Sequence, residues 1–213
     1  MRRFAEAWTP AGRLATGAAW AAALLLAGCA SVPDRYYTLA PSPHGLPAAA
    51  AAAHAPLAIE VAPVGVPERL ARPQMVLRSA GAAEVRVLEQ HRWASSFEQE
   101  LRDALGSGVA ARLGAADVTR GGRTPGQAVW RIGVQVQAFE AVEDAQVDTR
   151  LQWRLRRPDG TDAGGCAWAG QEAVSGGIDA VAQGAQRLTA RVAEALARQI
   201  TALQGGAVLR CEG

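Results

Sequence analysis

The stretch VWRIGVQVQAF, residues 129–139, alternates apolar side chains with polar or small ones along most of its length. Successive side chains of a β-strand point to opposite faces, so this pattern predicts a half-buried strand. Residues 147–155 alternate in the same way, and Pro158-Asp159-Gly160 after them is a strong turn signal. Residues 166–174 form a third candidate strand, so the region predicts an antiparallel meander.

Two amphipathic helices are predicted around this meander. Residues 178–203 carry apolar side chains at three- and four-residue steps, which is the spacing of one helix face. Before the meander, apolar residues fall four apart from Trp93 to Leu113, and Ser95 with Glu98 has capping-box spacing. Gly106 and Gly108 each weaken this helix by about 1 kcal/mol relative to alanine, so a break there is plausible.

Shorter patterns complete the expected fold. Residues 57–61, 74–78 and 84–88 read as three strands, and residues 207–211 as a short edge strand. Three strands, a helix, three strands and a second helix predict a single α+β domain. Its sheet is expected to be mostly antiparallel or mixed, with the two main helices packed on it.

The amino-terminal residues have the character of a secretory signal peptide. Arg2 and Arg3 precede an apolar run that ends in Leu26-Ala27-Gly28-Cys29. The run is shorter than the roughly 20 apolar residues of a membrane-spanning helix. The closing motif resembles a bacterial lipobox, which predicts cleavage before Cys29 and acylation of its thiol. Ala30 does not resemble an inner-membrane retention signal, so an outer-membrane location facing the periplasm is expected.

Three segments follow from this interpretation: a signal peptide at 1–28, a lipidated proline- and alanine-rich tether at 29–56, and a periplasmic domain at 57–213. Within the tether, residues 34–39 (DRYYTL) are β-prone and contain both tyrosines of the chain. This piece is expected to form either a first strand or a docking segment.

Charge and cysteine content bound the function further. The chain has 22 basic and 20 acidic residues, and the signal segment contains three of the basic and one of the acidic ones. The mature chain is therefore neutral, which gives no indication of nucleic-acid binding. Cys166 and Cys211 remain as an even pair in an oxidising compartment. They could form a disulfide, and the alternative is two separate buried thiols.

No motif indicates catalysis, a metal or a cofactor. No Cys or His pair has zinc-ligand spacing, and no glycine-rich phosphate loop occurs. Glu143, Asp144 and Asp148 read as a solvated bend. The tryptophans of the predicted domain could line an apolar ligand site, but core packing is the favoured interpretation; they are Trp93, Trp130, Trp153 and Trp168.

Several segments together resemble the ABC-type transport auxiliary lipoprotein family of the PqiC or YmbA type. The order is the lipobox, the tyrosine segment 35–39, the strand at 59–64, the stretch 67–76 with its Arg-Pro-Gln turn, and His91-Arg92-Trp93-Ala94 leading into a helix. The resemblance implies a non-catalytic component acting with an MCE-domain protein, a permease and an ATPase. Such systems are thought to move lipids or other hydrophobic molecules between membranes.

The resemblance also suggests partner-binding residues, namely Tyr36, Tyr37, Arg72, Pro73, Gln74, Arg92 and Trp93. The Arg72-Pro73-Gln74 turn and the Arg92-Trp93 pair are expected to lie together and shape a contact surface, or else to hold the sheet edge and the helix start in place. Self-association is a further option. A structural or assembly lipoprotein and a lipid-binding carrier remain the alternative functions.

Overall fold

The predicted meander forms the centre of a five-stranded sheet with the order β5-β2-β6-β7-β8. The computed structural model describes residues 32–40, 57–81 and 83–211, so the predicted signal peptide, Cys29 and most of the predicted tether lie outside the described residues. The strands of this sheet are β2 Leu57–Val61, β5 Ala116–Asp117, β6 Ala128–Val142, β7 Gln146–Arg156 and β8 Asp162–Ala173. Strands β6, β7 and β8 pair antiparallel, whereas β2 runs parallel to both β5 and β6.

The alternation along β6 decides which of its faces is buried. Trp130, Ile132 and Val136 point into the core, as predicted. A bulge between Val136 and Ala138 then inserts one extra residue, so that Phe139 takes the next buried position in place of Ala138. The sheet therefore keeps an apolar face along all of β6, although the sequence alternation changes phase within the strand.

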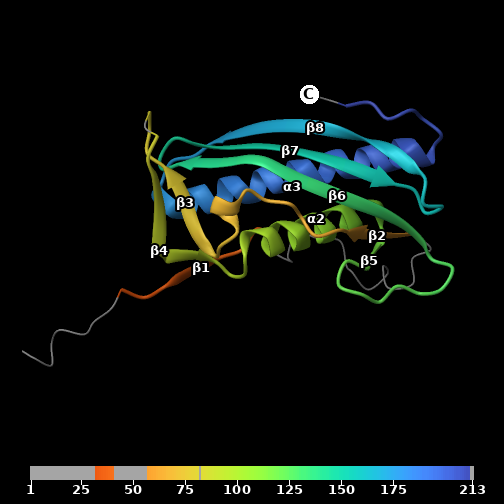
Figure 1. Ribbon diagram of the computed structural model, residues 1–213, viewed down its shortest axis with the longest axis horizontal. Helices are drawn as coiled ribbons and strands as arrows, with labels where there is room; N and C mark the ends of the chain where they lie inside the picture. Colours follow the sequence, from red (N-terminus) through yellow and green to blue (C-terminus); the bar gives the residue numbers. More distant parts are fainter. Residues whose placement is uncertain (1–31, 41–56, 82, 212–213) are drawn as a thin grey trace, which may run out of the picture. The chain divides into compact units, whose positions relative to one another are not determined.

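Two helices pack on the five-stranded sheet, as Figure 1 shows. Helix α2 (Phe97–Leu113) lies against β2 and β5, and helix α3 (Gly177–Gln204) lies mainly against β7 and β8. The predicted stripe of α3 is buried from Val181 to Leu203. Among the described residues, no helix is long and apolar enough to cross a bilayer.

A second, three-stranded sheet has the order β1-β4-β3 and lies at one end of the long strands (Figure 1). It consists of β1 Arg35–Tyr37, β3 Gln74–Arg78 and β4 Val85–Trp93, and a short 3₁₀ helix, η4 Glu68–Leu70, precedes β3. Strand β1 runs parallel to β4, which runs antiparallel to β3. The fold is thus α+β with two mixed sheets, where the sequence suggested one.

Helix α2 begins later than predicted. Trp93 is the last residue of β4, and its backbone N–H donates to the carbonyl oxygen of Pro73 at 2.7 Å. Ser96, rather than Ser95, is the N-cap residue, because its hydroxyl accepts the Gln99 N–H. The helix is continuous through both glycines. A Cβ atom at Gly108 would lie only 2.9 Å from that of Ala193, so this glycine permits close packing of α2 on α3.

The ends of the folded unit also differ from the prediction. Residues 207–211 form no strand. The compact unit begins at Asp34 rather than Leu57, because β1 pairs with β4 and the side chain of Leu39 is fully buried. The segment 34–39 is therefore the first strand of the domain and its immediate continuation.

Candidate functional site

Five of the seven predicted partner-binding residues lie in the three-stranded sheet, and the other two, Arg72 and Pro73, lie just before β3. In the pairing of β1 with β4, Tyr36 lies opposite Arg92 and Tyr37 opposite Trp93. On the other side of β4, Gln74 is the register partner of Arg92. The structure thus brings together three segments that are separated by about 20 to 40 residues in the sequence.

These residues differ in how they are presented to solvent. Trp93 is only 3% exposed and packs on Phe97 in the core, which agrees with the alternative that it holds the sheet edge and the helix start in place. Arg72 and Pro73 are exposed, and Tyr36 is 63% exposed. The Nε of Arg92 donates to the Glu89 carbonyl at 2.7 Å and lies 3.7 Å from an Asp34 carboxylate oxygen.

Tyr37 is the centre of a polar cluster that joins β1 to the first turn of α3. Its hydroxyl donates to Asp179 at 2.7 Å and lies 2.9 Å from His91 Nδ1. A hydroxyl has a single proton, and Tyr37 donates it to Asp179. In the second contact the donor is therefore the Nδ1–H of His91, and the Tyr37 hydroxyl oxygen accepts. Arg35 completes the cluster with an ion pair to Asp179 at 2.8 Å.

The cluster shifts the acid–base behaviour of two of its members. Burial, followed by the hydrogen bond to Asp179, raises the pKa of Tyr37 to about 12. The hydrogen bonds from Tyr37 and then Arg35 hold the pKa of Asp179 below its ordinary value of 3.8. Tyr37 therefore stays a neutral donor and Asp179 an ionised acceptor near neutral pH.

We expect Asp179→Asn to destabilise the domain more at neutral pH than near pH 3. A carboxylate with a lowered folded pKa contributes stability above its unfolded pKa, and that contribution is lost as the pH falls through the folded value. Urea unfolding of the wild type and the variant at both pH values measures the difference. An equal loss of stability at both values would contradict the proposed role of the ionised carboxylate, which faces Tyr37, Arg35 and His91.

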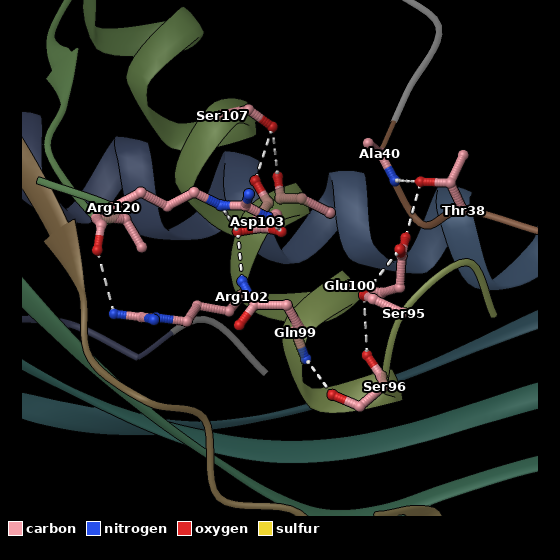
Figure 2. A network of polar contacts seen from close by, with 12 residues as sticks. Thr38, Ala40, Ser95, Ser96, Gln99, Glu100, Arg102, Asp103, Ser107 and Arg120 are labelled. Atoms are coloured by element: carbon pink, nitrogen blue, oxygen red, sulfur yellow. Dashed lines mark hydrogen bonds and ion pairs between the residues drawn. The ribbon is translucent and has the colours of Figure 1, made fainter. Parts of the chain in front are cut away.

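A second polar network holds the residues that follow β1 (Figure 2). Glu100 in the first turn of α2 is 7% exposed. Its carboxylate accepts the Leu39 N–H at 2.9 Å, the Thr38 hydroxyl at 2.7 Å and the Ser95 hydroxyl at 3.0 Å. From α3, the side-chain amide of Gln186 donates to the Thr38 carbonyl at 2.8 Å. Both helices therefore fix the segment that leaves β1.

The same network continues along α2 toward β5. Arg102 donates to the carbonyl oxygens of Val61 and Thr119, and Asp103 accepts the Gln99 side-chain amide and pairs with Arg120 (Figure 2). These bonds join α2 to the end of β2 and to the chain after β5. Their role is to position the helix that carries Glu100.

The other residues considered from the sequence have structural positions. Asp144 accepts the backbone N–H groups of Gly176 and Gly177 at 2.8 Å and so caps the start of α3. Trp130 and Trp153 are buried in the core, like Trp93, whereas Trp168 is partly buried under Arg191. Within the described part of the chain, no group of three or more His, Cys, Asp or Glu side chains could hold a metal ion.

Cys166 and Cys211 are joined by a disulfide with a Cα–Cα distance of 5.4 Å. Cys166 is buried on β8, whereas Cys211 is exposed in the chain that follows α3. The bond therefore ties the carboxyl-terminal residues to the edge strand of the five-stranded sheet. In the same region, Leu209 packs on Gly164, where a Cβ atom would lie 2.9 Å from its side chain.

The comparisons with known proteins agree with this fold. The model of the ABC-type transport auxiliary lipoprotein component matches residues 37–197. A crystal structure of an uncharacterized protein superposes with a TM-score of 0.63 at 20% identity, covering 79% of this chain and 99% of that one. Protein XCC0632 from Xanthomonas campestris, of the DUF330 family model, superposes with a TM-score of 0.53 at 18% identity, with coverages of 82% and 96%.

No curated protein matches the chain. At these identities the two solved structures establish the fold alone, and the family assignment rests on the matched model, which spans most of the domain from Tyr37 on β1 to Ala197 on α3. The chain belongs to the ABC-type transport auxiliary lipoprotein family.

Proposed function

We propose that this protein is the membrane-anchored, non-catalytic component of an MCE-type ABC transport system. In this proposal acylated Cys29 holds it on the periplasmic face of the outer membrane, and the domain binds the MCE-domain protein of a permease and ATPase complex. The system would move lipids or other hydrophobic molecules across the envelope. The observation that carries the proposal is the family match over residues 37–197.

The structure supports a binding role, because the polar groups of the two networks hold secondary-structure elements in place. The buried carboxylate of Glu100 and the Tyr37–Asp179 pair hold β1 in place, and Asp144 caps a helix. Arg92 on β4 and the exposed Arg72 and Pro73 before β3 are presented at a defined surface, which suits a protein contact.

A carrier that encloses a lipid is less well supported. The space lined by Leu70, Met75, Trp93, Phe97 and Phe139 lies inside the core, but its volume is about 10 Å³. A single buried water already needs about this volume. The larger hollow of about 600 Å³ near Gln135 and Arg154 is an open, mainly polar depression on the sheet. The core space is therefore too small for an acyl chain, and the depression near Gln135 is neither enclosed nor apolar.

Co-purification from gently solubilised envelopes tests the proposed partner. The tagged protein is expected to recover an MCE-domain protein, and the recovery should fall strongly for Cys29→Ala, which removes the anchor. Failure to recover any such protein, under conditions that keep another envelope complex intact, would favour the structural or assembly role.

Arg92→Ala is expected to reduce capture of the partner by roughly tenfold, or about 1.4 kcal/mol, because arginine is enriched among the residues that dominate interfaces. The melting temperature should change little, since the ion pair of Arg92 is partly exposed. Arg86→Ala is the matched control, because Arg86 lies on the same strand and pairs with Glu143 at 3.0 Å. A large drop in melting temperature for Arg92→Ala would instead identify Arg92 as a structural residue.

A further inference from the structure

Strand β1 is firmly built into the domain, although it comes soon after the predicted anchor residue. It pairs with β4, and its side chains bind α3 through Tyr37 and Asp179. The residues after it are held by Glu100 and by the burial of Leu39. The point at which the chain enters the folded domain is therefore Asp34, not Leu57.

This position shortens the link between anchor and domain. From Cys29 to Asp34 the chain is five residues long, so it spans at most about 18 Å when extended and about 12 Å on average when flexible. A tether that ran as far as Leu57 would average about 30 Å and could reach about 100 Å. The polar layer of a bilayer leaflet is roughly 5–8 Å thick. A short link therefore keeps β1 close to the lipid headgroups.

The surface next to this link suits such a location. The side chain of Tyr36, on the strand that the link enters, is 63% exposed. Tyrosine is enriched at membrane interfaces because its ring is apolar and its hydroxyl polar. Helix α3 starts beside β1 at Asp179, and its 28 residues extend about 42 Å away from it.

We propose that Tyr36 faces the bilayer that carries the anchor, with its ring in the headgroup layer. The proposal also places the far end of α3 farther from this membrane than Tyr36. This inference rests on the proposed function, since it takes acylation of Cys29 as its starting point. It also separates the two halves of the predicted tether: residues 30–33 set the distance to the membrane, whereas residues 41–56 only connect β1 to β2.

Depth-dependent quenching of a fluorophore on the full, acylated protein in phospholipid vesicles tests the orientation. The label is attached to Tyr36→Cys or, as the control, to Gln204→Cys at the other end of α3. Acylation occupies the thiol of Cys29 and the disulfide occupies the other two, so each variant has one free thiol. Headgroup-labelled quencher lipid should quench position 36 strongly and position 204 weakly. Equal quenching, or stronger quenching at position 204, would overturn the proposal.

Two matched insertions test the length argument. Twelve Gly/Ser residues between Ala30 and Ser31 raise the average link from about 12 to about 23 Å, and quenching at position 36 should fall roughly twofold. The same insertion between Ala50 and Ala51 should leave it unchanged. If both insertions or neither reduces quenching, the proposal is wrong.

Flotation of the vesicles separates this inference from the proposed function. Protein that floats only when Cys29 is intact, but shows no preferential quenching at position 36, overturns the orientation and leaves the anchor standing. Protein with an intact Cys29 that does not float overturns the anchor, and with it both the proposed function and this inference.

Discussion

Glu100→Ala is expected to lower the free energy of unfolding by about 2–4 kcal/mol and to release the segment that follows β1. The carboxylate accepts three hydrogen bonds at a site with 7% exposure, including the backbone N–H of Leu39. A hydrogen bond to a charged group contributes about 1.5–3 kcal/mol, and a buried donor left without an acceptor costs about 1–3 kcal/mol. Urea unfolding of both proteins measures the loss.

Glu98→Ala is the matched control, because Glu98 lies in the same first turn of α2 and its substitution removes the same charge near the helix start. Its expected effect is a few tenths of a kcal/mol, up to about 1 kcal/mol. Glu100→Gln keeps one acceptor oxygen and should fall between the two. Equal stability of Glu100→Ala and Glu98→Ala would show that the carboxylate does not hold the segment.

Loss of the disulfide is expected to have an effect of similar size. The bond closes a loop with a sequence separation of 45 residues, for which chain entropy predicts about 4 kcal/mol of stabilisation. Replacing both Cys166 and Cys211 with alanine should lower the free energy of unfolding by this amount. The substitution is best made in a Cys29→Ala background, so that no third thiol exchanges with the bond.

Reduction of the parent protein provides the control for this substitution. If the effect comes from the cross-link, dithiothreitol should destabilise the parent about as much as the double substitution does, and should not affect the double variant. A loss below about 1 kcal/mol in both experiments would mean that the unfolded chain gains little freedom without the bond.

Much of the fold could be predicted from the sequence where one face of an element is buried. Strands β2 and β3 begin and end where the alternation indicated, and the α3 stripe is buried as expected. Apolar residues recur at the period of a strand or helix when only one of its faces is buried. The bulge after Val136 is the exception, because it changes the phase of the pattern inside a strand.

The less predictable elements depend on distant contacts. Strand β1 has three residues and little apolar pattern, and it forms because Tyr37 reaches Asp179, 142 residues away. The end of β4 read as a helix start because Trp93 and Phe97 are four residues apart, although only Phe97 lies in the helix. A strand residue and a helix residue can pack in the same core even when their spacing in the sequence matches a helix by chance.

The candidate site was predicted in part. The sequence grouped Tyr36, Arg92 and the Arg-Pro-Gln turn, and Tyr36, Gln74 and Arg92 lie in one sheet with Arg72 and Pro73 just before β3. It gave no such role to Glu100 or Asp179. A signal for Glu100 existed, since it lies three residues after Phe97 and therefore on the apolar face of α2. Nothing local marks Asp179, because its partners come from β1 and β4.

The segment that begins five residues after the predicted anchor residue is part of the folded domain, and the proposed orientation depends on this. Native-state hydrogen exchange of the Leu39 amide tests it most directly, because this N–H donates to the buried Glu100 carboxylate. Protection comparable to that of core amides in α3, lost in Glu100→Ala, is the predicted result. Exchange at the rate of an unstructured peptide, while the α3 amides stay protected, would contradict it.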